Sequence, residues 1–142
     1  MIGKFTVQCE RGGHLTISVS TESLEPPFEY IKARAAIVAG GFHGSVRGEL
    51  ETDDLVRFYQ DFIELQKSLR GEIQLDSREG WLKIHVVADG LGHFIFDCTI
   101  AEFPSYDNTL QCRLETDQTF TRHTLDELDS IVQKILIADL GV

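Results

Sequence analysis

The feature that most constrains the fold is a stretch of helical periodicity in the middle of the chain. Over residues 52–71 apolar side chains recur every three or four positions, which predicts one amphipathic helix. Its apolar residues are Leu55, Phe58, Phe62, Leu65 and Leu69. Asp53 and Asp54 suit the positive end of the helix dipole. Thr52 is a candidate N-cap, and Gly71 is a candidate left-handed stop.

Alternating apolar and polar residues on both sides of this helix predict strands joined as hairpins. The expected elements are a hairpin over residues 4–20, a second hairpin over 29–50, a short strand near 72–75, long strands around 82–86, 94–100 and 110–114, and a second helix over about 125–138. Thr124 and Glu127 have the spacing of a capping box for that second helix. Loops are expected at 21–28, which contains paired prolines, and at 104–106.

Because opposed apolar residues must share one face of a sheet, the parity of each strand fixes the expected turns. In the first hairpin a three-residue loop at 11–13 would set Cys9 opposite Leu15. In the second hairpin a two-residue turn at 40–41 would set Ala33 opposite Gly48. We therefore predict an α+β fold, with an antiparallel sheet of about eight strands and two helices packed on one face. At 142 residues, the chain 1–142 is expected to form a single domain.

The chain is acidic, with 23 acidic and 13 basic residues and a formal net charge of -10. Such a surface repels nucleic acid and anionic membranes, so neither is expected as a partner. It attracts a basic protein and accelerates the encounter, although solubility alone would also explain the charge. The chain has no apolar run of about 18 residues and no apolar segment of a signal peptide near its first residues. We therefore expect a cytoplasmic location.

The cysteines and histidines give no metal-binding spacing. Cys9, Cys98 and Cys112 lack the Cys-x-x-Cys pattern and fall on the apolar sides of their strands. They are expected to be reduced, small hydrophobic residues of the core. No metal or other cofactor is predicted.

One polar row could belong to an enzyme or to a module that binds a small ligand. The predicted register places Asp97 opposite His85 on one side and opposite Arg113 on the other, which is a possible acid–base group. A cross-strand ladder of ion pairs explains the same row, and no serine or cysteine nucleophile lies beside it. A further alternative is a homodimer formed through the open polar face of the sheet or a free edge strand.

Acidic side chains gather at the start and on the outer side of the first helix. They are Glu49, Glu51, Asp53, Asp54, Asp61 and Glu64. Such a set is either a solvated helix face or a surface that docks a basic protein. The candidate partner-binding residues are Glu51, Asp54, Asp61 and Glu64.

Several short motifs occur in a characteristic order. They are Gly41-Phe42-His43-Gly44-Ser45-Val46, Asp54-Leu55-Val56-Arg57-Phe58, Leu69-Arg70-Gly71-Glu72, Asp89-Gly90-Leu91-Gly92-His93 and Glu115-Thr116-Asp117-Gln118-Thr119. Over about residues 30–137 this set resembles the WapI-type immunity protein family of small bacterial proteins. The resemblance implies protection of a cell from a toxin domain, often a nuclease, that a neighbouring cell releases. It carries no catalytic residues to transfer. The prediction is thus a non-enzymatic binding protein that occludes a basic toxin.

Overall fold

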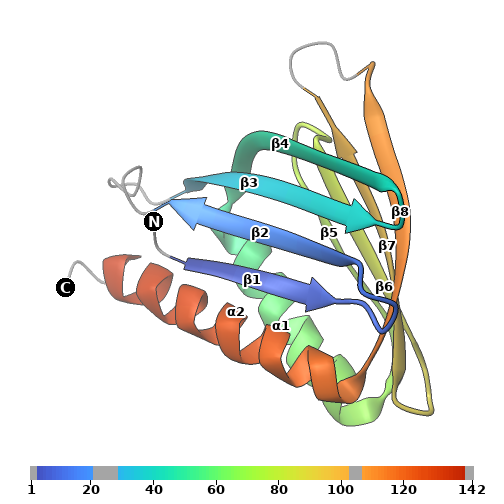
Figure 1. Cartoon of the computed structure of the whole chain (residues 1–142). Coiled ribbons are helices and arrows are strands. Elements are labelled where there is room, and N and C mark those ends of the chain that lie inside the picture. The colour runs from blue at the N-terminus through green and yellow to red at the C-terminus, as the bar shows by residue number, and fades with distance from the viewer. Residues whose placement is uncertain (1–2, 21–28, 103–106, 140–142) are drawn as a thin grey trace.

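The computed structural model describes residues 3–20, 29–102 and 107–139, and these residues build the same succession of elements twice (Figure 1). The first half comprises β1 (Gly3–Gln8), β2 (His14–Ser20), β3 (Tyr30–Ala39), β4 (Phe42–Glu51) and α1 (Thr52–Ser68). The second half comprises β5 (Arg70–Asp76), β6 (Leu82–Asp89), β7 (His93–Ala101), β8 (Thr109–Asp117) and α2 (Gln118–Asp139). Each half is thus an antiparallel four-stranded meander followed by a helix. The loops predicted at 21–28 and 104–106 lie outside the described residues.

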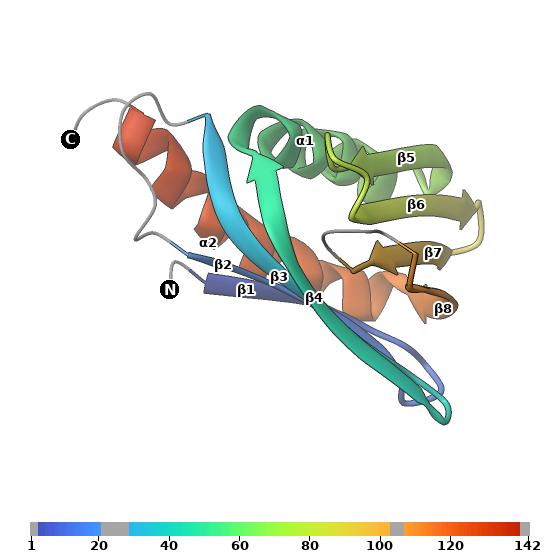
Figure 2. The same cartoon turned by 90° about the horizontal axis from the view of Figure 1, so that it is seen from above.

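The predicted α+β class is confirmed, with eight antiparallel strands and two helices in the described part of the chain. The strands form two four-stranded sheets, in the orders β1-β2-β3-β4 and β5-β6-β7-β8, where a single sheet was expected. The reason is that β4 runs directly into α1, so no hairpin joins β4 to β5. The expected packing of both helices on one face is not confirmed. Instead α2 runs beside β1, and α1 lies beside β5 and against α2 (Figures 1 and 2).

One hydrophobic core joins the two sheets and the two helices. Phe62 on α1 lies at its centre, with no exposed surface. Its ring centroid is 5.7 Å from that of Phe58, 6.4 Å from Phe94 and 6.0 Å from Phe96. The helical stripe predicted from the sequence therefore packs against the second sheet, where edge-to-face and tilted ring pairs add to the burial of apolar surface. That residues 1–142 form a single domain stays a prediction.

The ends of α1 differ from the prediction in detail. Thr52 is the first helical residue and donates its N–H to the carbonyl oxygen of Glu29 at 2.9 Å, so it is not the N-cap. The residue that ends the helix in the left-handed conformation is Leu69, with φ 60°, and not Gly71. The Leu69 N–H reaches the Leu65 carbonyl oxygen at 2.8 Å, and the chain enters β5 directly afterwards.

Helix α2 begins at Gln118, well before the predicted start at 125. Asp117 supplies the cap, because its Oδ1 accepts the N–H groups of Thr119 at 2.9 Å and Phe120 at 3.1 Å. The prediction placed the cap at the wrong residue because Thr124 and Glu127 have the right spacing but a different role.

The side chains of Thr124 and Glu127 bond backbone groups of Thr6 at the free edge of β1. The Thr124 Oγ1 donates to the carbonyl oxygen of Thr6 at 2.7 Å, and the Glu127 Oε1 accepts the Thr6 N–H at 3.0 Å. An edge strand exposes unpaired backbone groups of this kind, and covering them prevents pairing with another chain. Helix α2 thus replaces a fifth strand at this edge of the first sheet.

The predicted registers are confirmed in both sheets except in the first hairpin. In the β3–β4 hairpin Ala33 lies opposite Gly48, and in the second sheet Asp97 lies between His85 and Arg113. In the first hairpin Val7, and not Cys9, lies opposite Leu15. The connection is longer than predicted and spans residues 9–13. The Cys9 N–H bonds the Gly13 carbonyl oxygen at 2.7 Å, which closes this wider loop.

Candidate functional site

Three of the four predicted partner-binding residues lie along one groove between α1 and β5. The groove consists of two adjoining hollows of about 390 and 340 Å³. Asp54 and Asp61 line the first hollow, while Asp61 and Glu64 line the second. Strand β5 adds two carboxylates that the sequence analysis did not select, Glu72 and Asp76. Their proximity to α1 could not be inferred from spacing, because it depends on how the helix packs beside the strand.

Two arginines also line the groove, Arg57 in the first hollow and Arg70 in the second, against five carboxylates. Arg57 Nη1 lies 3.7 Å from Asp54 Oδ1, and Lys67 Nζ lies 3.8 Å from Glu64 Oε1. Both pairs join residues three positions apart on an exposed helix face, where an ion pair contributes little. Asp61 is exposed, and its side chain forms no hydrogen bond or ion pair with any residue in the described ranges. The groove therefore keeps a net negative charge at its centre.

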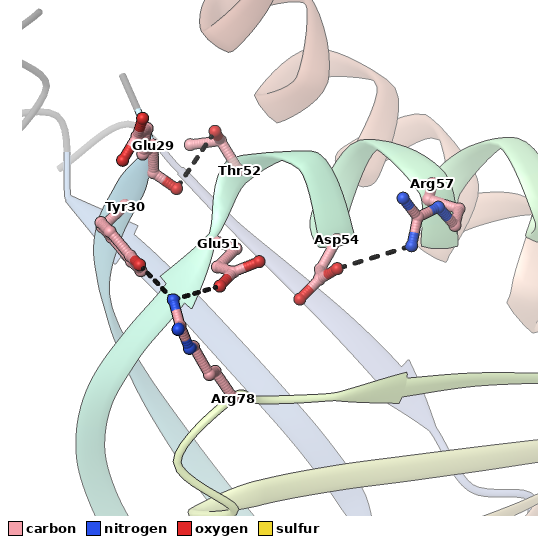
Figure 3. A network of polar contacts seen from close by, with 7 residues as sticks. All are labelled: Glu29, Tyr30, Glu51, Thr52, Asp54, Arg57 and Arg78. Atoms are coloured by element: carbon pink, nitrogen blue, oxygen red, sulfur yellow. Dashed lines mark hydrogen bonds and ion pairs between the residues drawn. The ribbon is translucent and has the colours of Figure 1, made fainter. Parts of the chain in front are cut away.

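Glu51 lines neither hollow and has a structural contact. Arg78 Nη1, on the turn between β5 and β6, lies 3.4 Å from Glu51 Oε1 and donates to the Tyr30 hydroxyl at 2.9 Å (Figure 3). Tyr30 and Glu51 together raise the pKa of the exposed Arg78 guanidinium. This network ties the turn of the second sheet to the ends of β3 and β4. Glu51 is thus engaged within the fold.

The His85–Asp97–Arg113 row exists in register across β6, β7 and β8. Within the described residues no hydrogen bond or ion pair joins its three side chains to one another. The His85 Nε2 lies instead 3.4 Å from the Glu72 Oε2, with the histidine side chain 42% exposed. None of the three residues lines the groove between α1 and β5 or the cleft along β4. A surface row of this kind has no means of excluding water from a substrate.

The cysteines are free, and two of them face each other across β7 and β8. Cys9 and Cys98 are buried and Cys112 is half-buried, as expected for small core residues. A hydrogen bond with Cys112, together with burial, raises the pKa of the Cys98 thiol, which keeps it protonated. Across the described ranges no group of three or more histidine, cysteine or acidic residues is arranged to hold a metal ion. None of the helices found there is both long enough and apolar enough to span a membrane.

A larger cleft that the sequence analysis did not foresee lies along β4 and measures about 690 Å³. Its charged lining residues are Lys32, Arg34, Arg47, Glu49, Glu79 and Glu102. Trp81 also lines the cleft, packs on Gly48 and donates from Nε1 to the Glu49 carbonyl oxygen at 2.9 Å. The pairing of Arg34 with Arg47 follows from the register predicted for the second hairpin. The cleft itself does not, because it forms where the two sheets meet.

The fold and its surfaces define a class of protein: an α+β chain with two meander-and-helix halves, an acidic groove and a charged cleft. The profile of the Immunity protein WapI-like family matches residues 10–136, nearly the whole length. The chain belongs to this family. This confirms the resemblance seen in the ordered motifs, and it suggests an immunity function.

Comparison with solved structures shows the fold alone. The structure of the plant transcriptional regulator PBF-2 is 13% identical, with a TM-score of 0.57, and the match covers 98% of this chain and 85% of that one. A structure described as "Crystal structures of trypanosoma bruciei MRP1/MRP2" is also 13% identical, with a TM-score of 0.45, and the match covers 95% of this chain and 82% of that one. No curated protein sequence gave a significant match.

Proposed function

We propose that this protein is a cytoplasmic bacterial immunity protein that neutralises a basic toxin domain by binding it, without catalysis of its own. The observation that carries the proposal is membership of the Immunity protein WapI-like family over residues 10–136. A nuclease is the expected kind of toxin, because nucleases hold phosphates and therefore tend to carry basic surfaces.

The acidic groove between α1 and β5 supports docking as the mechanism. Asp54, Asp61, Glu64, Glu72 and Asp76 bring five carboxylates to two adjoining hollows. The whole chain carries a formal charge of -10, so the long-range field and the local surface have the same sign. Electrostatic attraction of this kind raises association rates and selects a basic partner. Glu51 adds to the negative electrostatic field of the protein, but its pairing with Arg78 makes it a poor direct contact for the toxin.

The test is binding between this protein and the toxin domain encoded beside its gene, measured by stopped-flow association and calorimetry. The double variant Asp61→Lys/Glu64→Lys is expected to slow association about tenfold at low salt and to flatten its salt dependence. A matched control is Glu10→Lys/Glu115→Lys, which changes the net charge equally at exposed residues outside the groove. Glu51→Gln is expected to affect association less than either groove substitution.

Two results would count against this proposal. One is the absence of binding at micromolar concentration to any linked toxin. The other is a control variant that slows association as much as the groove variant, since that would leave net charge as the whole effect.

A further inference from the structure

Each sheet has two edge strands, and the structure covers their backbone groups to different degrees. At β1 the Thr124 and Glu127 side chains bond the N–H and carbonyl of Thr6. At β8 the carbonyl oxygen of Glu115 accepts the Glu10 N–H at 2.9 Å. Strand β5 is flanked by α1. Strand β4 differs, because residues 45–49 of this edge line the 690 Å³ cleft.

The hydrogen-bonding pattern of β4 shows which backbone groups point into that cleft. In an antiparallel pair the N–H and carbonyl of one residue point to the same side, and successive residues alternate. The Glu49 carbonyl points away from β3, because it accepts the Trp81 Nε1. Alternation then directs the N–H and carbonyl groups of Arg47 and Ser45 outward as well. Within the described residues no backbone group bonds these outward groups of Ser45 and Arg47.

The side chains of Arg34 and Arg47 place two cations side by side along this edge, whereas Lys32 lies opposite Glu49. Arg34 lies directly opposite Arg47, at a position where the backbones do not bond each other and the side chains come closest. Like charges placed directly opposite each other destabilise a sheet. The Ser45 Oγ holds the Arg34 side chain, accepting its Nε at 2.6 Å. Lys32 lines the same cleft, whereas Glu79 and Glu102 lie on its other wall.

We propose that the edge of β4 binds an extended acidic segment of a partner protein. The segment pairs as an added strand with the outward N–H and carbonyl groups of Ser45 and Arg47, and its carboxylates pair with the Arg34 and Arg47 guanidiniums. A peptide supplies both the backbone partners and the carboxylates. A long polyanion such as nucleic acid has no peptide N–H and carbonyl groups that could pair with this strand edge. This binding surface is separate from the acidic groove and does not depend on the toxin.

The test is an amide NMR titration of the isotope-labelled protein with a synthetic heptapeptide in which glutamate and valine alternate. We expect the largest shifts at the Ser45 and Arg47 amides, and slower hydrogen exchange at both. Two further peptides separate the contributions: one with lysine in place of glutamate, and one acidic peptide with N-methyl groups at the pairing positions. Both are expected to bind at least about tenfold more weakly, since one loses the charge pairs and the other loses the ladder hydrogen bonds.

The matching protein variant is Arg34→Gln/Arg47→Gln, expected to weaken binding of the acidic peptide about tenfold while far-UV circular dichroism stays unchanged. Lys4→Gln/Lys83→Gln is the control, with the same change in charge at exposed residues that do not line the cleft. The proposal is overturned by equal binding of the lysine peptide, by shifts confined to other residues, or by no shift at millimolar peptide. It is also overturned if the N-methylated peptide or inorganic phosphate binds as tightly, because the cleft would then be a simple anion site.

Discussion

The contact between Gly48 and Trp81 gives the sharpest prediction about stability. A Cβ atom built on Gly48 would overlap the Trp81 ring, coming within 2.5 Å of Cδ2 and closer to Cε2 and Nε1. Trp81 is 1% exposed, and its Nε1 bonds the Glu49 carbonyl oxygen. Gly48→Ala must therefore displace the indole from the junction of the two sheets. An alanine elsewhere in a strand would be favoured over glycine by about 0.5–1 kcal/mol.

The expected loss of stability follows from the packing and the hydrogen bond that the displaced indole loses. Removing a buried Trp side chain altogether costs about 3–5 kcal/mol, and a hydrogen bond contributes about 1 kcal/mol. Because the ring is displaced and not deleted, we expect Gly48→Ala to lower the free energy of unfolding by about 3 kcal/mol. For a chain of this size that corresponds to a fall in Tm of roughly 10 °C.

Urea unfolding followed by far-UV circular dichroism measures this loss. The fluorescence of Trp81, the single tryptophan of the chain, reports independently whether the indole becomes exposed, through a red shift of its emission. The matched control is Gly41→Ala in the same hairpin, where a Cβ meets no atom within 4 Å and φ is not positive. It should change stability by less than about 0.5 kcal/mol. A Gly48→Ala protein that is as stable as the control, with unshifted emission, would refute this account of the sheet junction.

Two further substitutions test polar groups inside the fold. The Tyr59 hydroxyl donates to Asp129 Oδ1 at 2.6 Å, and this bond together with burial raises the pKa of Tyr59 to about 12. Tyr59→Phe should lower the free energy of unfolding by about 1 kcal/mol at pH 7. The difference from wild type in urea unfolding should shrink as the pH rises from about 10 toward 12. The reason is that the hydroxyl stabilises the fold only while it is protonated. The buried Thr116 Oγ1 has no hydrogen-bond partner among the described residues, so Thr116→Val should raise the free energy of unfolding by about 1 kcal/mol in the same assay; a loss of stability would show that the hydroxyl is satisfied.

The sequence predicted local pairing well wherever a short turn fixed the register. The two-residue turn at Gly40–Gly41 set ten strand pairs correctly, from Ala39–Phe42 to Tyr30–Glu51. The first hairpin failed because parity constrains a register only to steps of two residues. Both the predicted and the observed registers put Leu15 on the apolar face. The longer loop is stabilised by the hydrogen bond from the Cys9 N–H to the Gly13 carbonyl oxygen, which strand parity cannot predict.

Long-range contacts set the limit of prediction for the helix ends and the candidate site. The spacing of Thr124 and Glu127 predicted an N-terminal cap of the second helix, yet both side chains bond Thr6, more than a hundred positions away in the chain. Asp54, Asp61 and Glu64, predicted as partner-binding residues from their spacing on α1, lie along one groove, and their role stays a prediction. Glu51 was grouped with them, although its side chain pairs with Arg78. Glu72 and Asp76 were passed over because only the packing of β5 beside α1 brings them into the groove.

The two binding surfaces proposed here differ in charge, and this difference makes their partners separable. The groove between α1 and β5 is acidic, whereas on the sheet wall of the β4 cleft the three cations Lys32, Arg34 and Arg47 outnumber Glu49. A basic toxin that docks in the groove brings a charge that the β4 wall repels, so the same toxin surface cannot serve both. Raising the salt concentration weakens both contacts, but backbone pairing at β4 should persist when the charges are screened. An interaction that survives high salt therefore points to β4, and one that vanishes points to the groove.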